Sequence, residues 1–358
     1  MHRRLTRQVS IGGVTVGGGA PVRIQSMTNT DTRDVAATVG QILALAEAGC
    51  QIVRVAVPDE AAAAAIRGIK KQISVPLVAD IHFSHRLALA AIDAGADKIR
   101  INPGNIGGEE NVREVVAAAK AAGIPVRIGV NSGSVEKELL AAHGGRSAAA
   151  LAESALRWEE KIRAMGLEDL VISVKSSDVV ENLEAHRILS ARTDTPLHIG
   201  ITEAGVGEAA LVKSAVGIGA LLLEGIGDTV RVSLTGDPVA EIAAAKQILA
   251  SVGQLPGAVN LISCPTCGRC QANLAGLAEE VRAGIEKLES ARIAAGRKDV
   301  LTVAVMGCAV NGPGEAAHAD VGIACGKGQA VLFKKGAQVG TVREADAAAA
   351  VLSEAEKL

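Results

Sequence analysis

The feature that most constrains the fold is a rhythm that repeats from about residue 20 to about residue 250. Short runs rich in β-branched residues alternate with longer Ala/Leu-rich segments whose apolar residues recur at helical spacing. Several of these segments, such as HRLALAAIDAGAD, reach a glycine where the helix should end. The runs are VRIQSM, IVRVAV, PLVADI, KIRIN, VRIGVN, LVISVKS, PLHIGIT and TVRVSL, beginning near Val22, Ile52, Pro76, Lys98, Val126, Leu170, Pro196 and Thr229. Eight strand–helix pairs predict an α/β fold, a closed (β/α)8 TIM barrel, with an open doubly wound sheet as the alternative.

Two segments flank this pattern. QVSIGGVTVGGGAPV precedes the first pair and predicts a hairpin that plugs the N-terminal end of the barrel. From about Asn260 the chain reads as short strands, two helices and a cysteine-rich run, which indicates a smaller α/β domain. Because SVGQLPGAV supplies glycine and proline between the two patterns, we expect a barrel domain at residues 1–250 and a second domain at residues 258–358.

Charge and composition exclude several classes of partner. The net charge is −2 and the aromatic residues are one Trp and two Phe, so neither a basic field nor a base-stacking platform for nucleic acid is expected. No apolar run approaches the roughly 18 residues of a membrane span, and MHRRLTRQVSIGG lacks the apolar stretch of a secretory signal. We therefore expect a cytoplasmic protein with no nucleic-acid or membrane partner.

Five of the predicted strands each carry a cation, although a barrel strand is buried on both faces. The five are Arg54, Arg100, Arg127, Lys175 and Arg231. A buried, unpaired cation is costly, so either each one pairs with a carboxylate or together they bind an anion at the C-terminal mouth of the barrel. The strands offer few acids, chiefly Asp80 and Glu203, so the sequence favours an anion such as phosphate or diphosphate, which guanidinium groups bind in a bidentate manner.

Polar residues gather at the ends of the same strands. They are Asp80, His82, Asn131, Ser176, Ser177, Glu203 and Ser233. The loop NPGNIGG directly after a strand could add backbone N–H donors for phosphate oxygens. Glu203 is the best acid/base candidate because burial and nearby cations can tune the pKa of its carboxyl group. The alternative is that Glu203 is only an ion-pair partner for Lys175 or Arg127.

The run SCPTCGRC places Cys264 and Cys267 on one tight turn, and Cys308 opens GCAVNGPGE at the end of an apolar strand. Cysteines from two such elements can converge on zinc or on an iron–sulfur cluster. The second segment has no further Cys or His nearby but has Glu315, a harder and more easily displaced ligand than a thiolate. These residues leave both kinds of metal centre open.

The motifs SCPTCGR, GCAVNGPGEA, KIRINPGNIG and ITEAG together resemble one family, the 4-hydroxy-3-methylbut-2-enyl diphosphate synthases in their bacterial two-domain form. The resemblance covers essentially the whole chain. It implies a 4Fe-4S cluster held by Cys264, Cys267, Cys308 and Glu315. It implies Glu203 as the acid near the substrate hydroxyl and a diphosphate site, with Asp80 and His82 at the barrel mouth beside it. The implied diphosphate-binding residues are Arg54, Arg100, Arg127, Asn131, Lys175 and Ser233.

One residue departs from the expected motif. Cys270 stands where the family is expected to have Thr or another residue without a thiol, which makes Cys270 a rival of Glu315 as the fourth ligand. Cys325 matches no ligand position of the family, and we expect Cys50 and Cys325 to be packing residues.

The reaction implied by the resemblance is reductive dehydroxylation and ring opening of 2-C-methyl-D-erythritol 2,4-cyclodiphosphate in the non-mevalonate isoprenoid pathway. Two electrons would pass singly through the cluster from flavodoxin or ferredoxin, in a homodimer that pairs the barrel of one subunit with the cluster domain of the other. Two rival hypotheses remain. One is a barrel enzyme of pterin or phosphate-sugar type with a structural zinc, and the other is a non-catalytic cluster-bearing scaffold or redox sensor.

Overall fold

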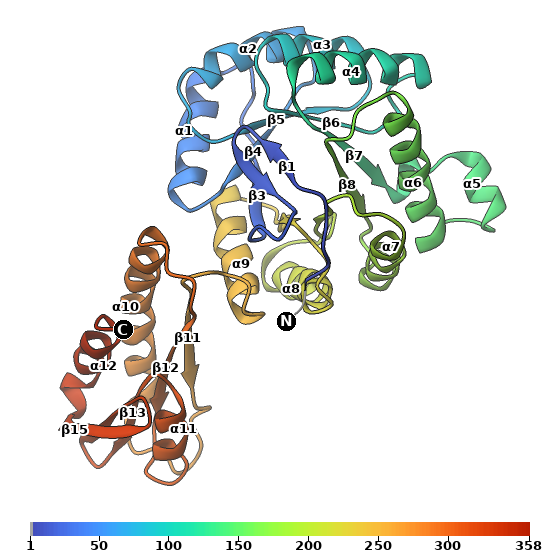
Figure 1. Cartoon of the computed structure of the whole chain (residues 1–358). Coiled ribbons are helices and arrows are strands. Elements are labelled where there is room, and N and C mark those ends of the chain that lie inside the picture. The colour runs from blue at the N-terminus through green and yellow to red at the C-terminus, as the bar shows by residue number, and fades with distance from the viewer. Residues whose placement is uncertain (1–2) are drawn as a thin grey trace. The chain divides into compact units, whose positions relative to one another are not determined.

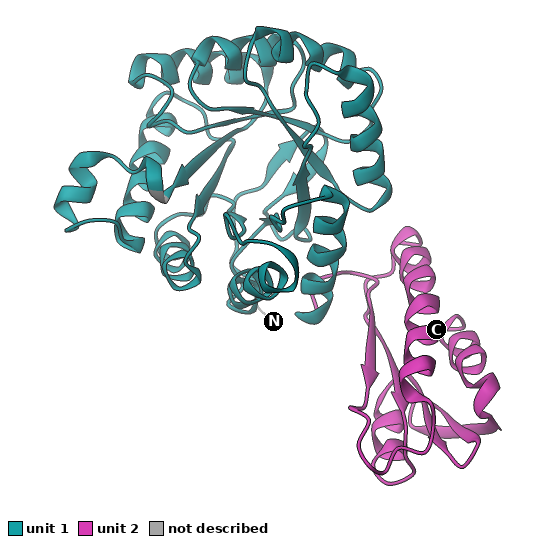
Figure 2. Ribbon diagram, turned by 180° about the vertical axis from the view of Figure 1, so that it is seen from behind, with its two compact units in different colours: residues 1–252 teal, residues 253–358 magenta. Residues whose placement is uncertain are grey.

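The computed structural model describes residues 3–358. The chain divides into two compact units, the first ending at Val252 and the second running from Gly253 to Leu358 (Figure 2). The two units are described separately below. No helix among residues 3–358 is long and apolar enough to cross a membrane.

The core of the first unit is an eight-stranded parallel sheet (Figure 1). Its strands are β3 (Arg23–Met27), β4 (Ile52–Ala56), β5 (Leu77–Ile81), β6 (Lys98–Ile101), β7 (Val126–Asn131), β8 (Leu170–Lys175), β9 (His198–Ile199) and β10 (Thr229–Val230). They pair in the order β8-β7-β6-β5-β4-β3-β10-β9, and a parallel bridge between Ile172 and Leu197 joins the two ends of that order. The sheet is thus a closed barrel, each strand lies in one of the eight predicted runs, and the predicted (β/α)8 fold is confirmed.

Helices follow the strands and surround them on the outside (Figure 1). They are α1 (Val35–Glu47), α2 (Glu60–Lys70), α3 (His85–Asp93), α4 (Glu109–Ala122), α6 (Ala148–Ala164), α7 (Val179–Arg192), α8 (Gly207–Leu223) and α9 (Pro238–Ser251). After β7 the chain adds a 3-10 turn, η1 (Ser132–Ser134), and a short helix, α5 (Lys137–Ala142). Asp34, Asp59, Asp178 and Asp237 start four of the helices by accepting a backbone N–H bond in the first turn.

A hairpin closes the N-terminal end of the barrel, as predicted. Its strands, β1 (Val9–Ile11) and β2 (Val14–Val16), pair antiparallel. The hairpin side chains of Val9, Ile11 and Val16 form one buried apolar cluster with Ile52, Val78 and Val171 from three barrel strands. Ile52 and Val78 therefore point into the barrel, and this apolar layer forms the floor of its interior.

The second unit is a five-stranded mixed sheet with helices on both faces. Its elements are β11 (Val259–Ser263), α10 (Leu274–Ala294), β12 (Leu301–Met306), α11 (Gly312–His318), β13 (Val321–Gly326), β14 (Gln329–Lys334), β15 (Ala337–Arg343), η2 (Glu344–Asp346) and α12 (Ala347–Ala355). The strands pair in sequence order, parallel from β11 to β13 and antiparallel from β13 to β15. Alternation along β12 sends Val303 and Val305 toward α10 and α12, and Ala304 and Met306 toward α11.

Candidate active site

The interior of the barrel carries a charged layer above its apolar floor. Side chains alternate along a strand, so Arg54 and Asp80, two residues beyond Ile52 and Val78, face the interior as well. Asp80 is paired in register with Arg100, which places this arginine in the same layer. The strand pattern thus brings one carboxylate and two guanidinium groups together, as the sequence predicts for residues at neighbouring strand ends.

Asp80 is the centre of this layer. Its carboxylate lies 3.0 Å from Arg100 Nη1, 3.7 Å from Arg54 Nε and 3.4 Å from His82 Nε2. Burial alone would raise the pKa of Asp80, but Arg54, His82 and Arg100 outweigh burial and hold the pKa well below its usual value. Asp80 therefore stays ionised and holds both arginines in position.

Arg127 and Lys175 line the same interior, Arg127 in register with Arg100 and Lys175 at the C-terminal end of β8. Arg127 is 1% exposed, and its Nη1 donates to Gln25 Oε1 at 3.4 Å. Lys175 is 8% exposed, with its Nζ only 2.9 Å from where a Cβ on Gly200 would lie. The glycine thus leaves the space that the Lys175 ammonium group occupies. Burial lowers the pKa of both side chains, and neighbouring cations lower it further.

The ion-pair alternative is correct for part of the cation set. Arg231 lies 3.2 Å from Glu241 of α9, which is 2% exposed and also accepts from Ser26 Oγ at 2.7 Å. Together with Asp80, this carboxylate accounts for three of the five strand cations. The strands do offer few acids, and the partner of Arg231 comes instead from a helix.

The remaining predicted barrel residues lie at strand ends. Asn131 ends β7, is half-buried, and its backbone N–H donates to Ser134 Oγ at 3.0 Å. Ser233 follows β10 and is half-buried. In the loop after β6, a Cβ on Gly104 would come within 3.1 Å of the Ser134 carbonyl oxygen, so the glycine lets the two loops approach closely.

Glu203 lies in the loop between β9 and α8, and its environment differs from the predicted one. The residue is exposed rather than buried, and no ion pair to Glu203 exists within 4.0 Å in the described part of the chain. The structure therefore does not support the alternative of an ion pair with Lys175 or Arg127. Glu203 has φ of 51°, a left-handed backbone that costs energy for a residue with a side chain and is frequent at functional sites.

The cysteine motifs of the second unit meet at the ends of two adjacent strands. β11 and β12 are parallel neighbours with Ser263 opposite Val305, so Cys264 and the Gly307–Cys308 segment leave the sheet side by side. The Gly307 N–H donates to Cys264 Sγ at 3.4 Å. Cys264, Cys267, Cys308 and Glu315 all line one pocket of about 390 Å³. The four predicted ligands are thus brought together by the fold.

Two of these thiols are held in surroundings that favour the thiolate. The backbone N–H groups of Asn311, Val310 and Gly312, at the start of α11, lower the pKa of Cys308. The backbone N–H and the charge of Arg269 lower the pKa of Cys267, although desolvation opposes them. Arg269 also lines the pocket. Thiolates are the ligand form for zinc and iron–sulfur centres, so the donor set fits a metal centre.

The donor set around this pocket is compatible with an iron–sulfur cluster. Three thiols and one carboxylate line it, and a 4Fe-4S cluster takes four protein ligands.

The other cysteines lie outside this pocket. Cys270 is half-buried against the core of the second unit, and its Sγ donates to the Ala272 carbonyl at 3.4 Å. Cys50 and Cys325 are 3% and 1% exposed, and burial raises the pKa of each thiol to about 11. Cys50 and Cys325 are therefore core residues, as predicted, while Cys270 occupies a position between core and pocket.

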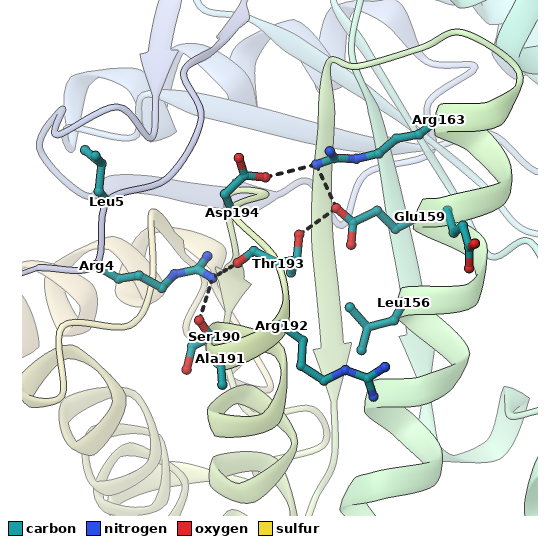
Figure 3. A pocket seen from close by; sticks show the side chains of 11 residues that line it. Arg4, Leu5, Leu156, Glu159, Arg163, Ser190, Ala191, Arg192, Thr193 and Asp194 are labelled. Atoms are coloured by element: carbon teal, nitrogen blue, oxygen red, sulfur yellow. Dashed lines mark hydrogen bonds and ion pairs between the residues drawn. The ribbon is translucent and has the colours of Figure 1, made fainter.

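A separate pocket of about 620 Å³ lies where α6 and α7 end, away from the C-terminal mouth of the barrel (Figure 3). Two of the three arginines that line it, Arg4 and Arg163, are bonded to other groups of the protein. Arg163 lies 2.8 Å from Glu159 and 3.2 Å from Asp194, and Arg4 donates to the carbonyl oxygens of Ser190 and Thr193. These bonds fasten the N-terminal segment to the C-terminus of α7, and we assign the pocket no catalytic role.

A (β/α)8 barrel with a cation-lined interior, followed by a unit with a pocket of three thiols and a carboxylate, is the arrangement of a barrel enzyme with a C-terminal domain whose donor set fits a metal centre. Family models match both parts, the GcpE TIM-barrel domain at residues 6–246 and the GcpE protein C-terminal domain at residues 260–357. The chain belongs to the GcpE family, and the family predicted from its motifs is confirmed.

Relatives that match nearly the whole chain support the same family assignment. Proteins named 4-hydroxy-3-methylbut-2-en-1-yl diphosphate synthase (flavodoxin) from Caldanaerobacter subterraneus subsp. tengcongensis and Geobacter sulfurreducens are each 54% identical to this chain, covering 99% of it and 98% of their own lengths. The Aquifex aeolicus protein of that name is 51% identical, over 100% of this chain and 98% of its own.

Solved structures resemble the barrel alone. A type I 3-dehydroquinate dehydratase from Clostridium difficile is 14% identical, with a TM-score of 0.52, over 69% of this chain and 98% of its own length. Yersinia pestis dihydropteroate synthase is 14% identical, with a TM-score of 0.51, over 68% of this chain and 98% of its own. At such identities the likeness supports the fold and nothing about the reaction.

Proposed function

We propose that the chain converts 2-C-methyl-D-erythritol 2,4-cyclodiphosphate to 4-hydroxy-3-methylbut-2-enyl diphosphate, an oxidoreductase step of isoprenoid synthesis, at a 4Fe-4S centre. The product is the one named in its relatives, which cover nearly the full chain. The observation that carries the proposal is the single pocket lined by Cys264, Cys267, Cys308 and Glu315. We assign substrate binding to a domain at residues 1–250 and cluster binding to one at residues 258–358.

In the barrel, the diphosphate is held by the cations that the fold already orders. Asp80 fixes Arg54 and Arg100, and Arg127 and Lys175 line the same interior beside them. Asn131 and Ser233 complete the phosphate contacts, and His82 stays against Asp80 at the mouth. Opening the ring breaks the bond between C2 and one phosphate oxygen, so the cations stabilise the negative charge that develops on the leaving diphosphate.

The reaction consumes two electrons and one proton. The C2–O bond to phosphate and the C3–O bond to the hydroxyl break, a double bond forms between C2 and C3, and one water leaves. A bound 4Fe-4S cluster supplies the electrons one at a time and a Lewis-acidic iron. Glu203 is exposed in the loop after β9 and donates the proton to the departing hydroxyl.

We infer that flavodoxin is the electron donor, as the names of the relatives state for those proteins, with ferredoxin as the alternative. The six cysteines are all free thiols, which suits the reducing cytoplasm, where we place the enzyme.

The anaerobically purified protein tests the proposal. We expect about four irons and four acid-labile sulfides per chain, a visible iron–sulfur absorption band, and dithionite-driven formation of the product from the cyclodiphosphate. Zinc without sulfide would favour the structural-zinc hypothesis. An intact cluster without binding of the cyclodiphosphate in calorimetry would favour the scaffold or sensor.

We further propose a homodimer in which one subunit supplies the barrel and its partner the cluster domain. Arg127→Ala and Cys308→Ser chains should each be inactive, and mixing them should restore part of the activity because one combined site is intact. The measurement is a product assay on co-expressed chains, with each variant alone as the control. Activity no higher than that of the separate variants would argue for a site built within one subunit.

A further inference from the structure

Four polar side chains from different strands carry a buried nitrogen with no partner inside the barrel. The atoms are Gln25 Nε2 on β3, Lys98 Nζ on β6, Arg127 Nε on β7 and His198 Nε2 on β9, and none bonds to any described residue. Buried polar nitrogens are normally satisfied. Gln25, Lys98 and Arg127 supply three unsatisfied donors, so this interior is prepared for additional negative charge or for water.

Lys98 is the extreme member of this set. It is 0% exposed, and its register partner is Val78, a member of the apolar floor. Arg100, two residues further along the same strand, lies on the same face of the sheet as Lys98. Lys98 was not among the predicted site residues, although the strand KIRI shows both cations on one face.

The carboxylates of this interior are bonded to other groups. Asp80 contacts Arg54, Arg100 and His82. Glu241 contacts Arg231 and also accepts from Ser26 Oγ and the Leu234 N–H. In the part of the chain that the structure describes, neither carboxylate forms an ion pair with Lys98.

Two arginines act on Lys98 from the strands around it, while the hairpin adds the apolar side chains of Val9, Ile11 and Val16 to the floor. The charges that act on Lys98 are those of Arg127 and Arg54. The same interior holds Arg100 and Arg231, each paired with a carboxylate, and two further titratable groups, Lys175 and His198, whose pKa burial lowers. Arginine keeps its proton in proteins, whereas a buried lysine can release it. Burial, followed by the charges of Arg127 and Arg54, lowers the pKa of Lys98 well below its usual value.

We propose that Lys98 is a positioning residue of the barrel site, uncharged in the free enzyme, which takes up a proton from solvent when the diphosphate binds above it. The inference rests on the proposed function, because the ligand must occupy the cation layer over Lys98. Two negative charges in this low-dielectric interior offset the repulsion from the arginines and make the ammonium form stable. Lys98 then adds a charge to the diphosphate site without burying an extra charge in the free protein.

The sign of the pH dependence follows from this coupling. The complex binds more protons than the free enzyme, so affinity for the diphosphate falls as pH rises between the pKa of Lys98 in the free enzyme and its pKa in the complex. In the pH range where Lys98 is neutral in the free enzyme and charged in the complex, this residue alone raises the dissociation constant by about tenfold per pH unit.

Calorimetry with the cyclodiphosphate and the intact holoenzyme, without reductant, tests the proposal. Titrations in two buffers of different ionisation enthalpy give the number of protons taken up. We expect Lys98→Met to lower the number of protons taken up by about one. We also expect it to remove the rise of about tenfold per pH unit that Lys98 contributes to the dissociation constant. The same variant should melt no lower than the wild type without ligand, because it removes a buried amine that has no partner.

The control is Lys71→Met, at the exposed C-cap of α2, which should leave proton uptake and affinity unchanged. If Lys98→Met does not fold, Lys98→Arg provides the second test, since a permanent charge should abolish the same proton uptake. Uptake equal to the wild type in the folded variants would overturn the role of Lys98. No binding of the cyclodiphosphate to the wild type would instead overturn the proposed function of the barrel.

Discussion

Replacing Cys308 with serine is expected to remove the iron–sulfur centre and to lower kcat by on the order of a thousandfold or more. Three backbone N–H groups at the start of α11 stabilise the Cys308 thiolate, and a serine hydroxyl in the same place keeps its proton and is a poor ligand for iron. Iron and acid-labile sulfide per chain, the visible absorption spectrum and a dithionite-driven assay measure the loss.

Cys270→Ser is the matched control, because it makes the same substitution at a cysteine of the other motif, SCPTCGRC. Cys270 packs against the core, donates to the Ala272 carbonyl, and does not line the pocket that Cys264, Cys267 and Cys308 share. We expect this variant to retain iron, sulfide and most of the activity. If it lost iron as completely as Cys308→Ser, the centre would have four thiolate ligands and the assignment of Glu315 would be wrong.

The barrel was predictable because its signal is repeated and local. Each of the eight strands lies inside a β-branched run, and the helices between them have the expected period. The strands in the runs PLHIGIT and TVRVSL are shorter than those runs suggest, since they comprise only His198–Ile199 and Thr229–Val230. At Gly200, a Cβ would lie 2.4 Å from the Arg231 carbonyl oxygen. The segments that follow β9 and β10 therefore approach each other closely although the regular strands have ended.

The sequence indicates which residues form the candidate site, but not which of them form ion pairs with one another. The cysteine motifs indicated a metal centre because their spacing carries the chemistry. The Glu241–Arg231 pair could not be predicted, since it joins a helix to a strand and depends on how α9 packs. Lys98 was detectable, because it alternates with Arg100 in KIRI and a strand buried on both faces should be apolar throughout.

Glu203→Gln is the second substitution with a large expected effect. We expect kcat to fall by about a hundred- to ten-thousandfold, because the amide cannot donate a proton to the departing hydroxyl, with little change in affinity for the cyclodiphosphate. Single-turnover assays and calorimetry separate the two quantities. Glu208→Gln is the matched control, since Glu208 is also exposed and lies in the first turn of α8, only five residues away.

A third variant, Glu203→Gly, separates the role of the side chain in the reaction from its effect on the loop backbone. Glu203 has φ of 51°, and a Cβ in this left-handed region costs about 1 kcal/mol. A glycine has no Cβ and adopts the same backbone without that cost. Glu203→Gly should therefore unfold at a temperature equal to or above that of the wild type while losing activity as Glu203→Gln does. A loss of both stability and activity in the glycine variant, with full activity in Glu203→Gln, would show that this residue shapes the loop and is not the proton donor.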